Sequence, residues 1–447
     1  MKEQIKLSDH FTYGKLFRFA LPSVIMLVFS SIYGVVDGIF VSNFAGKTEF
    51  SAVNFIMPIF MIIGGIGFMM GAGGTAIVAR TLGEGNPTLA KRYFSLFVYF
   101  TAIVGSIAAA LGVIFIRPLS AFLGAEGQLL DCCERYGSIV IAAMPAFMIQ
   151  NLFQSFFIVA EKPKIGLLVT VAAGVTNMVL DAVLVLLLPQ EFKLEGAAIA
   201  TATSQAVGGI VPIIYFGRKN TSLLKLGKTA IYGRALLKAM TNGSSELLSN
   251  ISSSVVTMLY NTQLLRLEGE DGVAAYGIIM YVGFIFVAMF IGYAIGTAPL
   301  VGYHFGANNK KELKNLFLKS SVICFTAGAA MTLVAFLFAR PLSIIFASYD
   351  THLLEMTVQG FQIFSFTFVC SGFAIYGSSF FTALNDGITS AILAFLRTVV
   401  FQISLILTLP LIWQLNGVWF SSLFAEILAL ISTVTFLVIY RKKYGYL

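Results

Sequence analysis

Four carboxylates in this 447-residue sequence stand inside long apolar runs, where an uncompensated charge is unfavourable. An ionised side chain at the centre of a bilayer costs about 2.5–3.5 kcal/mol even on a lenient insertion scale. Each such group therefore needs a water-filled cavity, a partner, a bound ion or a proton. The four residues are Asp37, Asp181, Glu246 and Glu426.

Asp37 and Asp181 are candidates for binding a coupling ion. Asp181 follows Asn177 by four residues, which places the two side chains on one face of a helix. If the runs that carry Asp37 and Asp181 meet, two carboxylates and an amide share a pocket that can take up a proton or Na⁺. The alternatives are an Asp37 exposed to water at a helix end, and an Asp181 that only joins two helices by hydrogen bonding.

Glu246 lies in a run rich in small polar side chains. Ser249 and Ser253 follow it on the same helix face, and we predict that the three residues line a substrate cavity. Packing between helices explains the serines equally well but leaves Glu246 unexplained. Glu426 has an opposite charge available in Arg397 of the preceding run, and for this pair we predict a structural ion pair.

The sequence shows no recognisable motif for a metal site, a disulfide framework or nucleotide binding. The four cysteines and three histidines are scattered without metal-ligand or disulfide spacing. Glycine clusters at 64–67 and 71–74 lack the strand-to-helix context of a dinucleotide site and are expected to serve packing or hinge motion. The sequence contains no Gly-x-x-x-x-Gly-Lys-Ser/Thr phosphate loop. We therefore expect no enzymatic reaction, no cofactor, and an ion gradient as the energy source.

Membrane-spanning helices must position these residues. Hydrophobic residues make up 58% of the chain and charged residues 11%, against about 25% charged in a soluble domain, and the mean hydropathy is +0.88. Strand-type alternation is absent, which leaves helices as the spanning structure. Runs of about 20 residues predict twelve spans: 17–40, 52–79, 94–116, 136–159, 165–188, 196–216, 240–265, 273–300, 317–338, 358–383, 388–412 and 417–440.

Basic residues predict the orientation of these spans. With the N-terminus inside, most of the 29 Lys and Arg fall on the cytoplasmic side, and both termini are then cytoplasmic. No cleavable signal pattern is expected, because Phe17 already begins a full-length span. The net charge is +8, but the basic residues lie at the ends of the predicted spans, near the membrane surface, which argues against nucleic acid as a partner.

The two halves of the chain repeat each other. Gly83-Glu84-Gly85-Asn86 matches Gly306-Ala307-Asn308-Asn309 at a displacement of 223 residues, which also carries Arg117-Pro118-Leu119-Ser120 onto Arg340-Pro341-Leu342-Ser343. Two six-span units predict parallel repeats related by an axis along the membrane normal, an arrangement typical of transporters. We expect an N-terminal lobe at 1–217, a basic cytoplasmic linker at 218–234 and a C-terminal lobe at 235–447.

Taken together, these features resemble the multidrug and toxic compound extrusion (MATE) family. The resemblance covers essentially the full chain, is nearest to the MepA-like and DinF-like bacterial branch, and is carried by Leu21-Pro22-Ser23, Val36-Asp37-Gly38, Gly83-x-Gly85-Asn86 and Asn177-x-x-x-Asp181. It implies an all-α fold in which two lobes form a V. It also implies that the protein exchanges H⁺ or Na⁺ for organic cations across the plasma (inner) membrane of a bacterium. It also implies that Asp37, Asn177, Asp181 and Thr201 act together in ion coupling. If the coupling ion is Na⁺, its ligands would be Asp37, Asn177 and Asp181.

Two alternatives remain open at this point. A lipid-linked oligosaccharide or lipid flippase of the same superfamily shares the paired-lobe plan, although a basic cavity would suit anionic lipid carriers better than an acidic one. A scaffold or sensor that transports nothing would have no need for buried acids. The expected partners are small organic cations and membrane lipid, and we expect the protein to function as a monomer. The choice between H⁺ and Na⁺ is left open.

Overall fold

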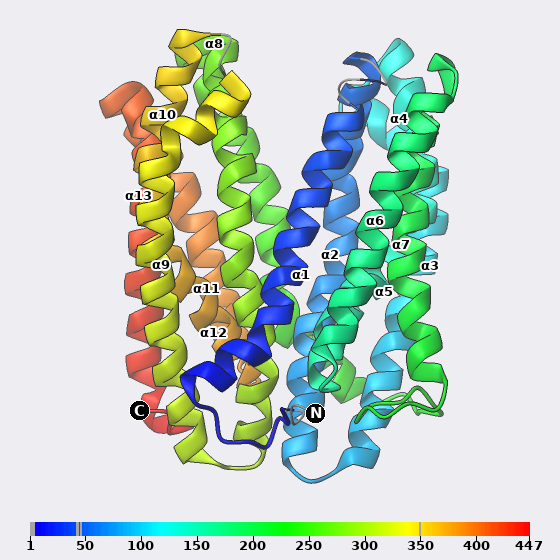
Figure 1. Ribbon diagram of the computed structural model, residues 1–447, viewed down its shortest axis with the longest axis vertical. Coiled ribbons are helices and arrows are strands. Elements are labelled where there is room, and N and C mark those ends of the chain that lie inside the picture. The colour runs from blue at the N-terminus through cyan, green and yellow to red at the C-terminus, as the bar shows by residue number, and fades with distance from the viewer. Residues whose placement is uncertain (1–4, 42–43, 45–46, 348–349) are drawn as a thin grey trace.

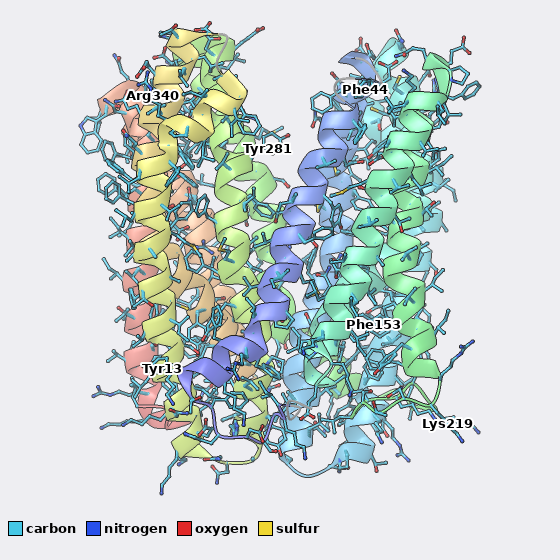
Figure 2. The ribbon with its side chains drawn as sticks, viewed as in Figure 1. Tyr13, Phe44, Phe153, Lys219, Tyr281 and Arg340 are labelled. Atoms are coloured by element: carbon cyan, nitrogen blue, oxygen red, sulfur yellow. The ribbon has the colours of Figure 1, made fainter. Side chains whose placement is uncertain are left out.

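The computed structural model describes residues 5–41, 44, 47–347 and 350–447, and every regular element in those ranges is a helix. The helices form two bundles that lie side by side (Figure 1). The bundles meet at the end of the molecule that carries both chain termini, and they diverge toward the opposite end. We call these the terminal end and the far end. Figure 2 shows Tyr13 and Lys219 at the terminal end, with Phe44 and Arg340 at the far end.

Each bundle is a continuous stretch of chain. The first contains α1 (Tyr13–Phe40), α2 (Lys47–Gly83), α3 (Pro87–Phe122), α4 (Gly127–Ala142), α5 (Met144–Val159), α6 (Pro163–Leu187), the 3₁₀ turn η2 (Gln190–Phe192) and α7 (Lys193–Gly217). The second contains α8 (Gly233–Gly306), α9 (Lys310–Ala347), α10 (Thr351–Ser365), α11 (Thr367–Ala383), α12 (Gly387–Phe395), the π-helical turn η3 (Leu396–Phe401) and α13 (Gln402–Tyr444).

All twelve predicted spans are found as helix. In the described part of the chain, eight helices are long and apolar enough to cross a membrane, and two pairs of bent helices pass the same test together. The long α8 is broken at Gly269, with a span on either side of the break. The backbone also leaves the helical region at Gln414 of α13, so that α12, η3 and the start of α13 form one span and the rest of α13 forms the next. The fourth and tenth predicted spans are the bent pairs α4 and α5, at 50°, and α10 and α11, at 46°.

Local sequence explains where several helices begin. Asn86 accepts a hydrogen bond from the backbone N–H of Leu89 over 3.2 Å, just before Pro87 opens α3. Asp350 and Asp386 cap α10 and α12 in the same way. Short polar side chains before the first turn, and proline within it, satisfy or remove backbone donors that a helix leaves unpaired.

Glycines let α2 and α8 approach closely where the bundles meet. A Cβ atom on Gly83 would overlap the carbonyl oxygen of Tyr303, and one on Gly306 would overlap that of Arg80. Each residue and its counterpart are separated by the same 223-residue displacement as the sequence repeat. The two bundles therefore present equivalent backbone surfaces to each other, as a twofold axis between parallel repeats requires.

The first helix crosses from one bundle to the other (Figure 1). Near its start α1 packs on the second half of α8, where a Cβ on Gly292 would lie 2.6 Å from Val24 Cα. Near its end α1 packs on α6, where the ring of Phe29 covers Gly174. Asp37, two turns beyond Phe29, is thereby carried into the interior of the first bundle.

Candidate functional site

The four residues predicted for ion coupling lie together in the first bundle. Asp37 comes from α1, Asn177 and Asp181 from α6, and Thr201 from α7. The Thr201 hydroxyl donates to Asp37 Oδ1 over 3.5 Å, and the Asp37 carboxyl also interacts with the side chains of Asp181 and Asn177. The exposed fractions of Asp37, Asn177 and Asp181 are 8%, 2% and 0%, so the water-exposed alternative for Asp37 is wrong.

Helix periodicity places the α6 residues in this pocket. The buried residues of α6 recur every three or four positions and so form one face: Gly166, Thr170, Ala173, Gly174, Asn177, Asp181 and Val185. Small residues at one end of this face admit α1, and Ser204 of α7 donates to the carbonyl oxygen of Ala173 over 2.8 Å. The polar end of the same face then meets Asp37 and Thr201.

The pocket holds more acceptor oxygens than donors. Both carboxyl oxygens of Asp181 and the Oδ1 atom of Asn177 are buried, and among the described residues no donor group reaches them; the polar neighbour of Asp181 is the carboxyl of Asp37. A buried carboxylate without donors is unfavourable as a bare ion, and a second carboxyl beside it increases the cost. A bound proton, or a cation held by oxygen ligands, removes that cost.

The ligand types limit which ion fits. Two carboxylates, an amide oxygen and a hydroxyl form an all-oxygen set, which suits a hard cation such as Na⁺, or a proton shared between the acids. Among the described residues, no group of three or more His, Cys, Asp or Glu could hold a metal ion. The arrangement therefore favours H⁺ or an alkali cation over a transition metal.

Sequence reasoning missed several polar neighbours of this pocket. Tyr33 of α1 interacts with Gln150 of α5 and lies within electrostatic range of Asp37. Tyr136 of α4, 1% exposed, lies within electrostatic range of both Asp37 and Asp181. From the sequence alone, such a tyrosine is indistinguishable from a residue of the hydrophobic core. Only the structure, which places it near the acids, identifies it as part of the site.

The predicted substrate residues lie in the second bundle, on α8. Glu246 and Ser249 are half-buried, whereas Ser253 is exposed and donates to the carbonyl oxygen of Asn250 on its own helix. The charged neighbour of Glu246 is Arg397. The structure thus leaves Glu246 and the serines on one helix but does not group them with the acids of the first bundle.

The predicted ion pair between Arg397 and Glu426 is confirmed. Arg397 Nε lies 3.0 and 3.1 Å from the two carboxyl oxygens of Glu426, and a second guanidinium nitrogen lies 3.0 Å from Oε1. Arg397 belongs to the π-helical turn η3, an irregularity that often occurs at functional sites. Arg397 is therefore paired with Glu426 of α13 and also lies within electrostatic range of Glu246 of α8.

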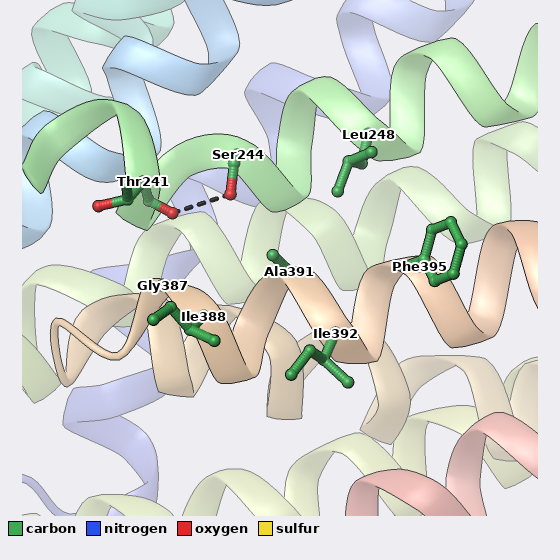
Figure 3. A pocket seen from close by; sticks show the side chains of 8 residues that line it. All are labelled: Thr241, Ser244, Leu248, Gly387, Ile388, Ala391, Ile392 and Phe395. Carbon is green, nitrogen blue, oxygen red and sulfur yellow. Dashed lines mark hydrogen bonds between the residues drawn. The ribbon is translucent and has the colours of Figure 1, made fainter. Parts of the chain in front are cut away.

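A shallow groove lies between α8 and α12 in the same bundle (Figure 3). Ser244 donates to the carbonyl oxygen of Thr241 across one edge, over 2.8 Å, and Ile388 and Phe395 are exposed apolar side chains. None of the lining residues is charged. The groove is therefore an apolar surface that suits lipid, and it is separate from both sets of acids.

Comparison with known proteins places this geometry in a family. The sequence profile of the MatE family matches residues 22–183 and 247–408, once in each bundle. The multidrug export protein MepA of Staphylococcus haemolyticus is 25% identical over 415 residues, covering 93% of this chain and 90% of its own length. MepA of Staphylococcus aureus (strain MRSA252) is 24% identical over 434 residues, with 96% and 94% covered.

Solved structures show the same fold. A crystal structure of MATE in complex with MaL6 superposes with a TM-score of 0.93 at 21% identity, covering 99% of this chain and 98% of that one. An outward-facing structure of a multidrug resistance MATE family transporter of the MOP superfamily gives 0.92 at 21% identity over 100% of both chains. MepA is thus a similar protein over nearly the whole chain, and with the family profile matched in both bundles, the chain belongs to the MATE family of membrane transporters, which are not enzymes.

Proposed function

We propose that this protein exports small amphipathic organic cations in exchange for H⁺ or Na⁺ by alternating access. The observation that carries the proposal is the buried pocket of Asp37, Asn177, Asp181 and Thr201, in which Asp181 has no donor among the described residues. Multidrug export by the MepA relatives supports the substrate class. The transporter works in the bacterial plasma (inner) membrane, as a monomer surrounded by lipid.

The ion binds in the first bundle and acts through the equilibrium between two states. The N-terminal lobe is 1–217, the linker 218–234 and the C-terminal lobe 235–447, with both termini cytoplasmic. The terminal end is then the cytoplasmic end, and the lobes meet there in an outward-open state. An ion entering from outside shifts the equilibrium only if it binds one state more tightly, because equal affinity for both would shift nothing.

The second bundle supplies a place for the cationic substrate. Glu246 is a half-buried carboxylate, with Ser249 and Ser253 following on the same helix. Arg397 lies within electrostatic range but is paired with Glu426, so the Glu246 carboxyl is left available to an incoming cation. An apolar cation with a single charge fits such a mixed surface.

Flippase activity toward an anionic lipid carrier is less well supported. A carrier with a phosphate head group would need positive charge in the cavity. The unpaired charges of the first bundle's pocket are carboxylates, and the guanidinium of Arg397 is held by Glu426.

Ethidium efflux from cells or inverted vesicles tests the proposal. Wild type and Asp37→Asn are compared while a protonophore and the Na⁺ gradient are varied independently. We expect efflux that depends on one gradient, which names the ion, and that is lost in Asp37→Asn. Asp271→Asn is the matched control, because Asp271 is a half-exposed aspartate of α8 in the second bundle, outside the pocket. Absence of efflux under every gradient would contradict the proposal and favour the flippase.

A further inference from the structure

Residues 5–12 form a strap that runs across the terminal end before α1 begins (Figure 1). The strap contains no regular helix, yet Leu7 is 1% exposed and Phe11 is not exposed at all. The ring of Phe11 packs edge-on against Phe19 of α1, with centroids 6.0 Å apart, and against His304 of α8, at 6.5 Å. This burial means that the strap is a docked segment with contacts to both bundles.

The second bundle holds the strap through its backbone. Glu312, at the start of α9, accepts from the backbone N–H of Phe11 over 2.9 Å and pairs with His10 Nδ1 over 2.6 Å. The carbonyl oxygen of Phe11 accepts from the side chains of Asn315, over 2.9 Å, and Lys319, over 2.7 Å. Three side chains of one helix thus satisfy both backbone groups of a single strap residue.

The first bundle holds the same strap four residues earlier. Glu161, in the turn between α5 and α6, accepts from the backbone N–H of Leu7 over 2.7 Å. The backbone of Glu161 has a φ of 59°, in the left-handed region that side-chain-bearing residues seldom adopt. Two carboxylates separated by 151 positions in the chain therefore bind two N–H groups of one short segment, one from each bundle.

We propose that the strap is an inter-bundle clamp that keeps the terminal end closed, with Glu161 and Glu312 as its positioning residues. The proposal rests on the alternating access argued above, because opening this end would require the bundles to separate. The strap cannot stay bound to both bundles when they part. Three side chains of α9 bind the strap at His10 and Phe11, so we expect it to stay on the second bundle and the bond between Leu7 and Glu161 to break.

A cysteine at Ala79 reports on this closure. Ala79 of α2 is not exposed, and a Cβ on Gly302, in the second half of α8, would lie 3.2 Å from the Ala79 Cβ. Ala79→Cys places a small thiol between α2 and α8, and the thiol becomes reactive when the two bundles separate. The rate of alkylation by N-ethylmaleimide is measured in detergent without substrate or gradient, against protein that carries only the native cysteines.

The variants remove or retain the side-chain oxygen with which Glu161 or Glu312 accepts a hydrogen bond from the strap. Glu161→Ala and Glu312→Ala remove it, whereas Glu161→Gln keeps a side-chain oxygen that can accept from Leu7. Because a hydrogen bond to a charged group is among the stronger ones, we expect alkylation of Ala79→Cys to rise about ten-fold in each alanine variant. Glu161→Gln keeps the acceptor oxygen but loses the charge, so its rate is expected to lie between those of the unmodified protein and Glu161→Ala. Glu84→Ala is the control, because Glu84 is an acid at the same end, in the turn after α2, and pairs with Arg80 of α2 instead of the strap.

The outcomes separate the clamp from a merely structural role and from the proposed function. Unchanged alkylation in both alanine variants, or a rise in Glu161→Gln equal to that in Glu161→Ala, would overturn the clamp. In the efflux assay the clamp variants are expected to change the maximal rate and to leave the half-saturating ethidium concentration unchanged. Faster alkylation in a protein that moves no ethidium under any gradient would support the clamp and refute cation export.

Discussion

Gly83 of α2 lies so close to the backbone of Tyr303 in α8 that a single added methyl group would overlap the Tyr303 carbonyl oxygen. Gly306 stands in the equivalent relation to Arg80, displaced by the repeat distance. Closure of the terminal end thus depends on the absence of two side chains. Close backbone approach through small residues is the usual way in which helices associate tightly in a membrane.

Alanine at either glycine is therefore predicted to wedge the bundles apart. Overpacking of this kind costs about 1–3 kcal/mol, and here separation of the two helices relieves it. We expect Gly83→Ala and Gly306→Ala each to accelerate alkylation of Ala79→Cys by about ten-fold or more. Gly277→Ala is the control, since a Cβ there meets nothing within 4 Å. Equal rates in all three variants would contradict the role of the glycine contacts.

The carboxyl of Asp181 is predicted to be needed for efflux and to lower the stability of the folded protein. Its two buried oxygens have no donor among the described residues, so replacing the carboxyl by a neutral amide of the same size removes an unfavourable charge. We expect Asp181→Asn to raise the thermal unfolding midpoint in detergent while abolishing ion-driven efflux. A variant with normal efflux would show that the second carboxyl is not part of the coupling site.

Removing one member of the Arg397–Glu426 pair is predicted to lower stability, in contrast to Asp181→Asn. Removing one partner of a buried ion pair leaves an uncompensated charge, at a cost of about 3–5 kcal/mol, whereas replacing both with apolar residues is often close to neutral. We expect Arg397→Met to lower the unfolding midpoint strongly and Arg397→Met with Glu426→Leu to recover most of the loss. If the double variant is as unstable as the single one, the pair is held by something other than mutual charge compensation.

Asp386, in the turn between α11 and α12, predicts a dependence of stability on pH. Burial raises the pKa of this carboxyl, but hydrogen bonds from Tyr444 and from Thr389, with the charge of Lys443, together hold the pKa below its usual value. A lowered folded-state pKa contributes stability above the unfolded-state pKa, and that contribution is lost as the pH falls through the folded-state value. The unfolding midpoint of the wild type should therefore exceed that of Asp386→Asn at neutral pH.

The same reasoning gives the test. The difference in midpoint between wild type and Asp386→Asn should shrink as the pH falls below about 4, the ordinary range of an aspartate. Tyr444→Phe removes one of the stabilising donors, which is expected to move this loss of stability to higher pH. A difference that stays constant between pH 7 and pH 3 would contradict the assignment.

The sequence predicts the fold well because the lipid environment imposes a simple pattern. Long apolar runs predict the spans, and the four-residue spacing of Asn177 and Asp181 predicts a shared face, since both are properties of a single helix. The meeting of Asp37 with Asp181 was predicted only on the condition that two helices touch. Thr201 entered through family resemblance alone, as its own sequence context carries no signal.

Contacts between distant parts of the chain were beyond prediction. His10 and Glu312 are 302 positions apart, and nothing in the residues near Phe11 suggests that α9 binds its backbone. The electrostatic neighbourhood of Glu246 and Arg397 was missed for the same reason. Such contacts depend on how the two bundles and the N-terminal segment pack, and helical periodicity says nothing about that packing.

Exchange in proteoliposomes tests the central claim most directly. Purified protein is reconstituted, an ethidium gradient is held constant, and either a pH difference or a Na⁺ difference is imposed across the membrane. The account predicts that one of the two ion gradients drives ethidium against its own gradient in the wild type, and that neither does so in Asp37→Asn or Asp181→Asn. Ethidium movement that is indifferent to both ions, or that persists unchanged in the two variants, would contradict coupling through this pocket.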